Sequence, residues 1–562
     1  MIAIKRTKAQ LSREAISRLY ISMQHLFIRG SYKPLGVSGE AMIEALQALE
    51  PEIYGSINDP EKVELNGLFY VFQRLPQGIE ECRYIKLISR EGFETSNFKS
   101  IIPAKRRRDC YRIDAEQMFV EMTRGRSDIY DILTHLTFLY IEAEKIRINS
   151  INHRLEKRRE WLMLEEVVQK EENQEAFDKN IAYTYLSTIL GRTYDETLAA
   201  CKRFSSVSKV NSLFHVTYWL GSLSMEEFFE KNDREITFSS SLRENIGHHL
   251  YGELWAQNLK KFLQEQDLLD RPIHIISANL HSVMNSLYGV AAKVGKKRGS
   301  TLEDIARSLG TKDNKVIRDR VEAYALKNGM YQIDDTSGTN ISVQVVDTTK
   351  LDPTSLPAEI SFNKKYIQKK RPVLLVMNYA FGEQAYETMD ELLKPYDWQD
   401  KKIKLSIESI SIMGKAGILQ GGKGDIMIPN AHVFEGTADN YPFKNDLTVD
   451  QFEGQGLKVL GGPMITVLGT SLQNKDILSY FKLSSWGVIG LEMEGAHYQK
   501  AIQAASKIRN SISENVTLRY AYYASDNPLE TGGTLASGSL GLDGVKPTYL
   551  ITQKILNSIL NP

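Results

Sequence analysis

The chain of 562 residues carries 70 Lys and Arg side chains and 70 Asp and Glu side chains, so it has no formal net charge at pH 7. A single hydrophobic core rarely grows to this length, and we therefore expect two or more domains. The neutral balance argues against a protein whose main task is binding a nucleic-acid backbone, because such proteins carry a basic excess.

Neither the cysteines nor the apolar runs point to an exported or membrane protein. Cys82, Cys110 and Cys201 are few, odd in number and widely spaced, so they predict neither a disulfide framework nor a metal site. The N-terminal sequence MIAIKRTKAQLSREAISRLY lacks the apolar core of a signal peptide. No apolar run approaches the ~18 residues of a membrane span. We therefore expect a soluble cytoplasmic protein that does not bind membranes.

Helical periodicity dominates residues 1–268. Apolar positions recur at helical spacing between Gln10 and Leu49, and long amphipathic patterns follow between Asp114 and Arg203. The aromatic-rich stretch from Leu65 to Ile102 instead predicts strands or irregular structure. The basic run Lys105 to Arg108 could bind phosphate, although a solvated turn is the commoner outcome for such a run. We predict a mostly helical domain here, and its sequence indicates no role.

Residues 271–562 have the composition of an α/β domain. The apolar run Ile273 to Ile276 is followed by a polar turn and a helix start, which predicts a strand, a turn that contains His281, and a helix. Later runs such as RPVLLVMNYAF and TLRYAYYASD predict further buried strands. We interpret residues at about 290–370 as an insertion in this domain. Its apolar spacing is typical of a helix-turn-helix reader and equally of a plain helical hairpin.

The segment SSWGVIGLEMEGAHYQKAI, residues 484–502, organises this domain. If Val488 to Leu491 form a strand, then Glu492, Met493 and Glu494 lie at its carboxyl end, where open α/β sheets bind ligands. An ionised carboxylate can accept two hydrogen bonds from a vicinal diol such as that of ribose. Solvated glutamates at an ordinary strand-to-helix junction are the alternative for this stretch taken alone.

Four short motifs follow one another in the α/β half: GKAGIL at 414–419, GDIMIP at 424–429, LEMEGA at 491–496 and ASDNPL at 524–529. Their order and spacing resemble the nucleoside phosphorylase and nucleosidase superfamily, which includes AMP nucleosidases. The resemblance covers about residues 371–562 and reaches loosely back to the first strand. It implies a three-layer α/β/α domain with a mixed sheet, preceded here by the mostly helical domain.

The resemblance implies cleavage of the N-glycosidic bond of a purine nucleoside or nucleotide. Asp526 would hydrogen-bond or protonate N7 of the leaving base, which needs a carboxyl whose pKa is raised by partial burial. Ser525 beside it is a substrate-binding candidate. His281 or Ser282 falls near the position of the water-activating group, where the family's glutamate has no clear counterpart. Leu472 stands where nucleosidases place an aromatic ring that stacks on the base.

Six further positions match those that hold the ribose and an anionic group in the family: Glu492, Met493, Glu494, Gly414, Lys415 and Gly417. The glycines would let the backbone approach ribose or phosphate. The Lys415 ammonium would either meet an anionic oxygen or face solvent.

Because SDNPL is closest to the AMP nucleosidase form of the motif and a large N-terminal domain is present, hydrolysis is favoured. No phosphate-binding arginine of the phosphorylase type is evident, which leaves phosphorolysis as an alternative. A noncatalytic nucleotide sensor or DNA-associated regulator is the other alternative, and the neutral chain argues against nucleic acid. Nothing in the sequence requires a metal or cofactor. The expected partners are the substrate, phosphate if the reaction uses it, and further copies of the chain in a homo-oligomer.

Overall fold

The computed structural model describes residues 6–206, 211–292, 301–311, 314–437, 439–530 and 540–562. The chain forms two compact units, the first comprising Met1–His248 with Ser471–Ile477, and the second comprising His249–Thr470 with Leu478–Pro562. The division falls ahead of helix α10 (Leu250–Glu265) and not after it, as the expected boundary at 268–271 would require. Among the described residues, no helix combines the length and apolar character needed to cross a bilayer.

Helices dominate the first unit, as expected. They are α1 (Lys8–Arg29), α2 (Val37–Leu49), α3 (Leu65–Phe72), α4 (Gly125–Ser150), α5 (Arg159–Glu172), α6 (Lys179–Leu190), α7 (Tyr194–Ser205), α8 (Leu213–Glu230) and α9 (Ser240–Gly247). A six-stranded sheet accompanies them, in the order β1 (Ser31–Tyr32), β6 (Glu235–Phe238), β2 (Tyr84–Ile88), β5 (Gln117–Glu121), β4 (Cys110–Arg112) and β3 (Ser100–Ile101).

One expectation for the first unit was wrong, and another holds in part. The sequence GLFYVFQRL lies mostly in helix α3 and not in a strand, because the Glu64 carboxylate caps the helix by accepting hydrogen bonds from the N–H groups of Asn66 and Gly67. The basic run begins in a turn with Lys105 and Arg107 exposed, but its last residue is buried. Arg108 is 2% exposed, and its Nη2 lies 2.9 Å from Asp128 Oδ1.

The second unit is built on one mixed sheet. Its strand order is β15 (Asn440–Pro442), β14 (Ile426–Phe434), β16 (Val459–Thr466), β17 (Gly490–Glu492), β13 (Ile407–Ile418), β7 (Ile273–Ser277), β10 (Val373–Met377), β9 (Val343–Asp347) and β8 (Met330–Ile333). Strand β18 (Thr517–Asp526) pairs with β13 and β14. A separate hairpin is formed by β11 (Tyr396–Trp398) and β12 (Lys401–Ile403).

Strand β10 shows why this unit has three layers. Its alternate residues face opposite sides of the sheet. Val373, Leu375 and Met377 enter one buried apolar cluster, whereas Leu374 and Val376 enter another. A strand buried on both faces needs a helical layer on each. The expected α/β/α architecture is therefore confirmed.

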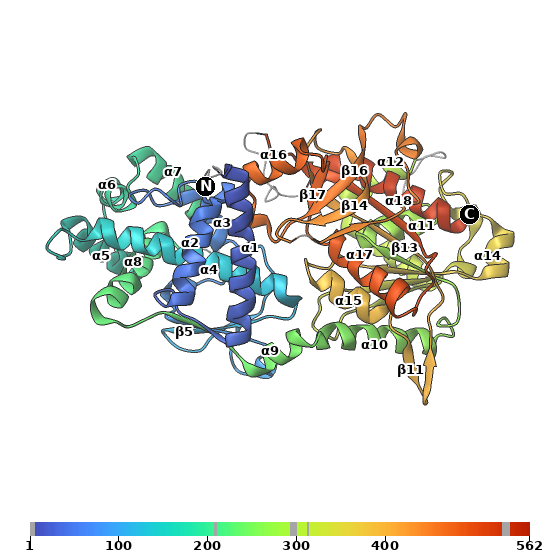
Figure 1. The fold of residues 1–562 in the computed structure, drawn as a ribbon, viewed down its shortest axis with the longest axis horizontal. Coiled ribbons are helices and arrows are strands. Elements are labelled where there is room, and N and C mark those ends of the chain that lie inside the picture. The colour runs from blue at the N-terminus through green and yellow to red at the C-terminus, as the bar shows by residue number, and fades with distance from the viewer. Residues whose placement is uncertain (1–5, 207–210, 293–300, 312–313, 438, 531–539) are drawn as a thin grey trace, which may run out of the picture. The chain divides into compact units, whose positions relative to one another are not determined.

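Helices α10, α15 (Gln384–Leu392) and α17 (Gly495–Gln503) contribute to the first of these clusters. Helices α11 (Leu280–Tyr288), α12 (Leu302–Gly310), α13 (Lys315–Lys327), α14 (Lys364–Lys370) and α18 (Val545–Leu560) contribute to the second. Figure 1 shows α15 and α17 on the side of the sheet opposite to α11 and α18. Helix α16 (Lys475–Leu483) begins in the first unit and continues in the second.

The insertion expected at about 290–370 contributes to the core of the second unit. Of the apolar side chains that suggested a helix-turn-helix, Leu302, Ile305 and Leu309 are buried in the second cluster and Ala306 is buried, whereas Val316 is 71% exposed. The two strands that end the insertion, β8 and β9, extend the central sheet at its edge. Burial in this core therefore accounts for the helical spacing of Leu302, Ile305 and Leu309.

Candidate active site

Strands β7, β10, β13 and β18 run in one direction, so their carboxyl ends meet at the same edge of the sheet. The loop after β10 brings Tyr379 to this edge, where its phenol lies close enough to Tyr523 of β18 and to the backbone of Asn279 for both to affect its pKa. Burial by surrounding groups and then Tyr523 raise the pKa of Tyr379 well above its usual value. The residue nevertheless remains 40% exposed.

Gly414 lies beneath this tyrosine on β13. A Cβ atom added there would be 3.6 Å from Tyr379 Cε1 and 3.9 Å from Tyr522 Cδ1, which are ordinary contacts. The fold itself therefore does not require glycine at this position. The Tyr379 ring lies over Gly414, and the approach of a ligand to the Gly414 backbone remains a prediction.

We expect Gly414→Ala to weaken substrate binding at least tenfold while leaving the melting temperature within about 2 °C of the wild type, since no protein atom is displaced. Thermal melts and KM measurements check this. Gly490→Ala is the matched control, because its Cβ would lie 2.4 Å from Met427 Sδ and should destabilise the fold. An unchanged KM in the Gly414 variant would remove this glycine from the site.

Glu494 is the N-cap residue of helix α17 and reaches the same loop. Its Oε1 accepts a hydrogen bond of 3.0 Å from the backbone N–H of Gly382. Burial, followed by repulsion from Glu492, raises the pKa of Glu494 to about 8. Met493, which precedes it, is buried. The carboxyl group of Glu494 thus lies near the Tyr379 loop. Because its pKa is raised, a ligand that hydrogen-bonds to it can change its protonation state.

Glu492 behaves differently from its neighbour, although both were expected beside the ribose. It is buried, and it accepts hydrogen bonds from the Thr466 hydroxyl and from the backbone N–H groups of Glu494 and Gly495. Burial tends to raise its pKa, but the His432 contact and these hydrogen bonds lower it overall. Both carboxylate oxygens are occupied by the protein. We therefore assign Glu492 to holding the start of α17 and not to contacting ribose.

His432 was missed by the sequence analysis. Its ring is fully buried on β14 with Nδ1 3.4 Å from Glu492 Oε1, and it stacks on Phe443 with ring centroids 5.4 Å apart. The nearest signal was a histidine three positions after the end of the GDIMIP motif, and this spacing does not indicate its partner. Its ring therefore helps to hold the Glu492 carboxylate in place.

Asp526 ends strand β18 and is 3% exposed. It pairs with Gly417 beside a bulge in β13. Burial raises its pKa, while Ser525 and then Lys415 and Lys423 act to lower it. Asp526 Oδ2 is buried and has no hydrogen-bond partner among the described residues. A buried oxygen without a partner favours either a proton or a ligand donor.

The hydroxyl of Ser525 bears on the protonation of Asp526. Ser525 Oγ lies within hydrogen-bonding distance of Asp526 Oδ1 and 3.1 Å from the carbonyl oxygen of Ala416. One hydroxyl has a single hydrogen. The hydroxyl donates to Asp526 Oδ1 and shares its hydrogen with the Ala416 carbonyl oxygen. This contact favours the ionised carboxylate and opposes the rise in the pKa of Asp526 that burial causes.

Three further expectations have different outcomes. Lys415 is exposed, and its charge is felt by Asp526, so its ammonium is near the site. His281 lies in the first helical turn of α11 and not in the loop before it. Asn279 caps that helix by accepting a 3.0 Å hydrogen bond from the His281 N–H. The His281 side chain is exposed. Leu472 lies in Ser471–Ile477, which belongs to the first unit. Its expected contact with a base remains a prediction.

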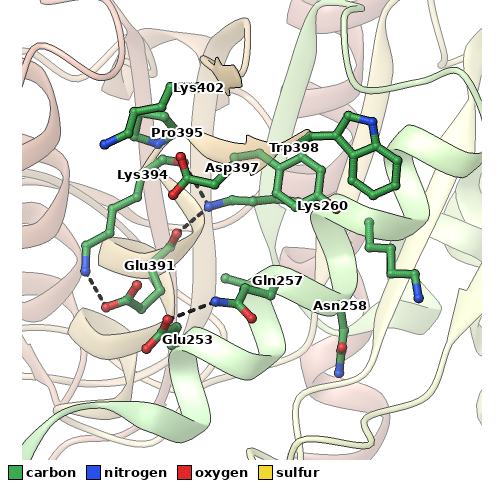
Figure 2. Close-up of a pocket in the computed structure, with 13 residues that line it drawn as sticks. Glu253, Gln257, Asn258, Lys260, Glu391, Lys394, Pro395, Asp397, Trp398 and Lys402 are labelled. Carbon is green, nitrogen blue, oxygen red and sulfur yellow. Dashed lines mark hydrogen bonds and ion pairs between the residues drawn. The ribbon is translucent and has the colours of Figure 1, made fainter. Parts of the chain in front are cut away.

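A cavity elsewhere in the same unit has a volume of about 570 Å³ and is lined by α10 and the β11–β12 hairpin (Figure 2). Its most buried cation, Lys260, donates hydrogen bonds of 2.7 and 2.8 Å to the carbonyl oxygens of Glu391 and Lys394. These carbonyls end helix α15, so Lys260 caps that helix. We therefore assign the residues that line this cavity a structural role, in contrast to the group around Asp526.

The fold and this group of side chains define the second unit as a three-layer α/β protein with polar groups gathered at the carboxyl ends of its parallel strands. A family described as a family of unknown function, DUF6909, has a model that matches residues 40–304 and 307–561. The chain belongs to this family. No curated protein matches it.

Several solved structures are similar at a low level. A methylthioadenosine/S-adenosylhomocysteine nucleosidase from Campylobacter jejuni is 10% identical, with a TM-score of 0.30 and coverage of 52% of this chain and 97% of that one. The futalosine hydrolase of Helicobacter pylori is 11% identical (TM-score 0.31, coverage 52% and 99%). A purine nucleoside phosphorylase from Toxoplasma gondii is 13% identical (TM-score 0.29, coverage 52% and 92%). This similarity is too distant to decide an activity.

Proposed function

We propose that this protein cleaves the N-glycosidic bond of a purine nucleoside or nucleotide by hydrolysis. The observation that carries the proposal is Asp526, a buried carboxyl with a raised pKa and an oxygen that no described residue engages. Such a group can protonate or hydrogen-bond a ring nitrogen as negative charge builds on a leaving base. The motif resemblance around Ser525 and Asp526 supports the same role.

In the proposed reaction, water attacks the anomeric carbon and forms a C–O bond while the C–N bond to the base breaks. The bonding electron pair passes to the base, whose N7 takes the Asp526 proton, and the proton released by water returns to solvent. Glu494 accepts hydrogen bonds from the ribose hydroxyls, and Gly414 allows the sugar to approach the backbone. Lys415 is placed to meet an anionic 5′ group of a nucleotide.

The deciding experiment incubates the purified chain with AMP, adenosine and inosine, each with and without phosphate, and measures free base and the sugar product. Hydrolysis predicts free base and an unmodified sugar in the absence of phosphate. Base release only with phosphate, together with a sugar 1-phosphate, would make the protein a phosphorylase. Tight nucleotide binding without any base release would make it a sensor and overturn the proposed reaction.

A further inference from the structure

A cluster of metal-binding side chain types lies in the first unit, at a place the proposed reaction does not use. Glu80 and Glu81 end a short 3₁₀ turn, Ile79–Glu81, and His215 lies in the first turn of α8. His215 Nε2 is 2.9 Å from Glu81 Oε1 and 3.7 Å from Glu80 Oε1. One ligand atom from each residue lies within 4.8 Å of the other two.

These separations suit a shared ion. Tetrahedral ligands held about 2.1 Å from a zinc ion lie about 3.4 Å from one another, and the two measured distances bracket that value. The backbone elements already hold the three side chains together, so little rearrangement is needed to admit an ion at their centre.

The second observation comes from Glu80 itself. Its side chain is 2% exposed, and its Oε1 accepts a hydrogen bond from the Asn211 amide. Its Oε2 is buried and has no hydrogen-bond partner in the part of the chain that the structure describes. A buried carboxylate oxygen without a donor is costly unless a cation or proton satisfies it.

Neighbouring groups orient the cluster as a second shell does at metal sites. Asn211, which donates to Glu80, is itself held by a 3.1 Å hydrogen bond from Gln77. Arg112 Nη2 lies 3.0 Å from Glu81 Oε2 and leaves Oε1 of that residue toward His215. Partners of this kind fix ligand orientation and tune affinity. Arg112 also offsets one of the two negative charges, so the site suits a divalent ion of moderate affinity.

We propose that Glu80, Glu81 and His215 bind one divalent first-row transition-metal ion, with Zn²⁺ the best match to one imidazole and two carboxylates. Imidazole disfavours Mg²⁺ and Ca²⁺, whereas the absence of thiolate from the three ligands disfavours soft ions. Three protein ligands leave a fourth position for water. This site is independent of the proposed glycosidase reaction and revises the expectation that no metal binds.

The test uses the full-length chain, stripped with a chelator and titrated with ZnCl₂ by isothermal calorimetry. We expect one Zn²⁺ of moderate affinity per chain, and a loss of affinity of at least tenfold in Glu80→Gln and in His215→Gln. The variants His153→Gln and Glu166→Gln are controls, since both residues are exposed. Titration of the wild type with Co²⁺ should give visible absorption bands of a tetrahedral or five-coordinate ion.

Thermal melts of the stripped variants check that any lost binding is not lost folding. If a variant fails to fold, the Co²⁺ spectrum of the wild type still decides whether a nitrogen and oxygen site of low coordination number exists. No stoichiometric Zn²⁺ binding by the wild type would overturn the proposal. Binding that survives both cluster substitutions unchanged would overturn it equally, because the ion would then lie elsewhere.

Discussion

Asp526→Asn should lower kcat by about 10²–10⁴-fold with little change in KM, because the lost proton donor acts only as charge builds on the leaving base. The substitution keeps the shape of the side chain, and Ser525 can still donate to the remaining carbonyl oxygen. Initial rates of base release with the best nucleoside or nucleotide substrate measure the effect.

Substrates with very good leaving groups provide the control for this prediction. A nitrophenyl riboside needs no protonation of its leaving group, so the Asp526 variant should cleave it at a rate close to that of the wild type. If kcat for a purine substrate stays within about threefold of the wild type, Asp526 has no part in the chemistry.

Glu494→Ala should cost about 1.5–3 kcal/mol of transition-state binding for ribosides and much less for 2′-deoxyribosides, because the carboxylate is proposed to accept from the ribose diol. The measurement is kcat/KM for paired ribo and deoxyribo substrates. An equal loss for both sugars would contradict the assignment.

The pH dependence of binding tests the same residue in another way. Because burial and the charge of Glu492 raise the pKa of Glu494 to about 8, its carboxyl is mostly protonated at neutral pH when no ligand is bound. The ionised form accepts two hydrogen bonds from a diol, so riboside affinity should rise as pH increases through about 8. Glu494→Gln cannot ionise and should give a flat profile over this range.

Parts of the fold could be predicted because local patterns decide them. The run VLLVM had to be a strand buried on both faces, and β10 is one. The carboxyl ends of parallel strands had to share an edge, which is why the Tyr379 loop and Tyr523 of β18 lie close together. The strand expected at Val488 to Leu491 begins two residues later but ends beside Glu492 as expected.

Other parts depend on contacts between residues far apart in sequence. Nothing local to Glu492 reveals that Thr466 and His432 occupy its carboxylate, so the two glutamates of LEMEGA looked equivalent. Likewise, Glu81 and His215 are 134 positions apart, and no spacing rule joins them. Patterns within a segment predict where a side chain lies in its element, whereas its partners depend on the folded chain.

The boundary between the units illustrates the same limit. The helical pattern of residues 250–265 matched the preceding helices, so α10 was assigned to the helical half. Its Trp255, Leu259 and Leu263 instead enter one apolar cluster with Ile273 and Leu375 of the central sheet. A helix that covers a sheet and a helix in a bundle have the same periodicity, and only the packing partner distinguishes them.

The return of Ser471–Ile477 to the first unit has a consequence for synthesis on the ribosome. In the finished protein Asn474 Nδ2 donates to the Leu49 carbonyl oxygen at 2.8 Å, and the Glu52 N–H donates to the Gln473 carbonyl oxygen at 2.9 Å. Domains generally fold as they emerge, N-terminal first. Here the backbone groups of Leu49 and Glu52 in the nascent first unit must remain hydrogen-bonded to water until residue 477 has emerged. Translation therefore cannot finish the two units one after the other, because the earlier one is closed by residues made within the later one.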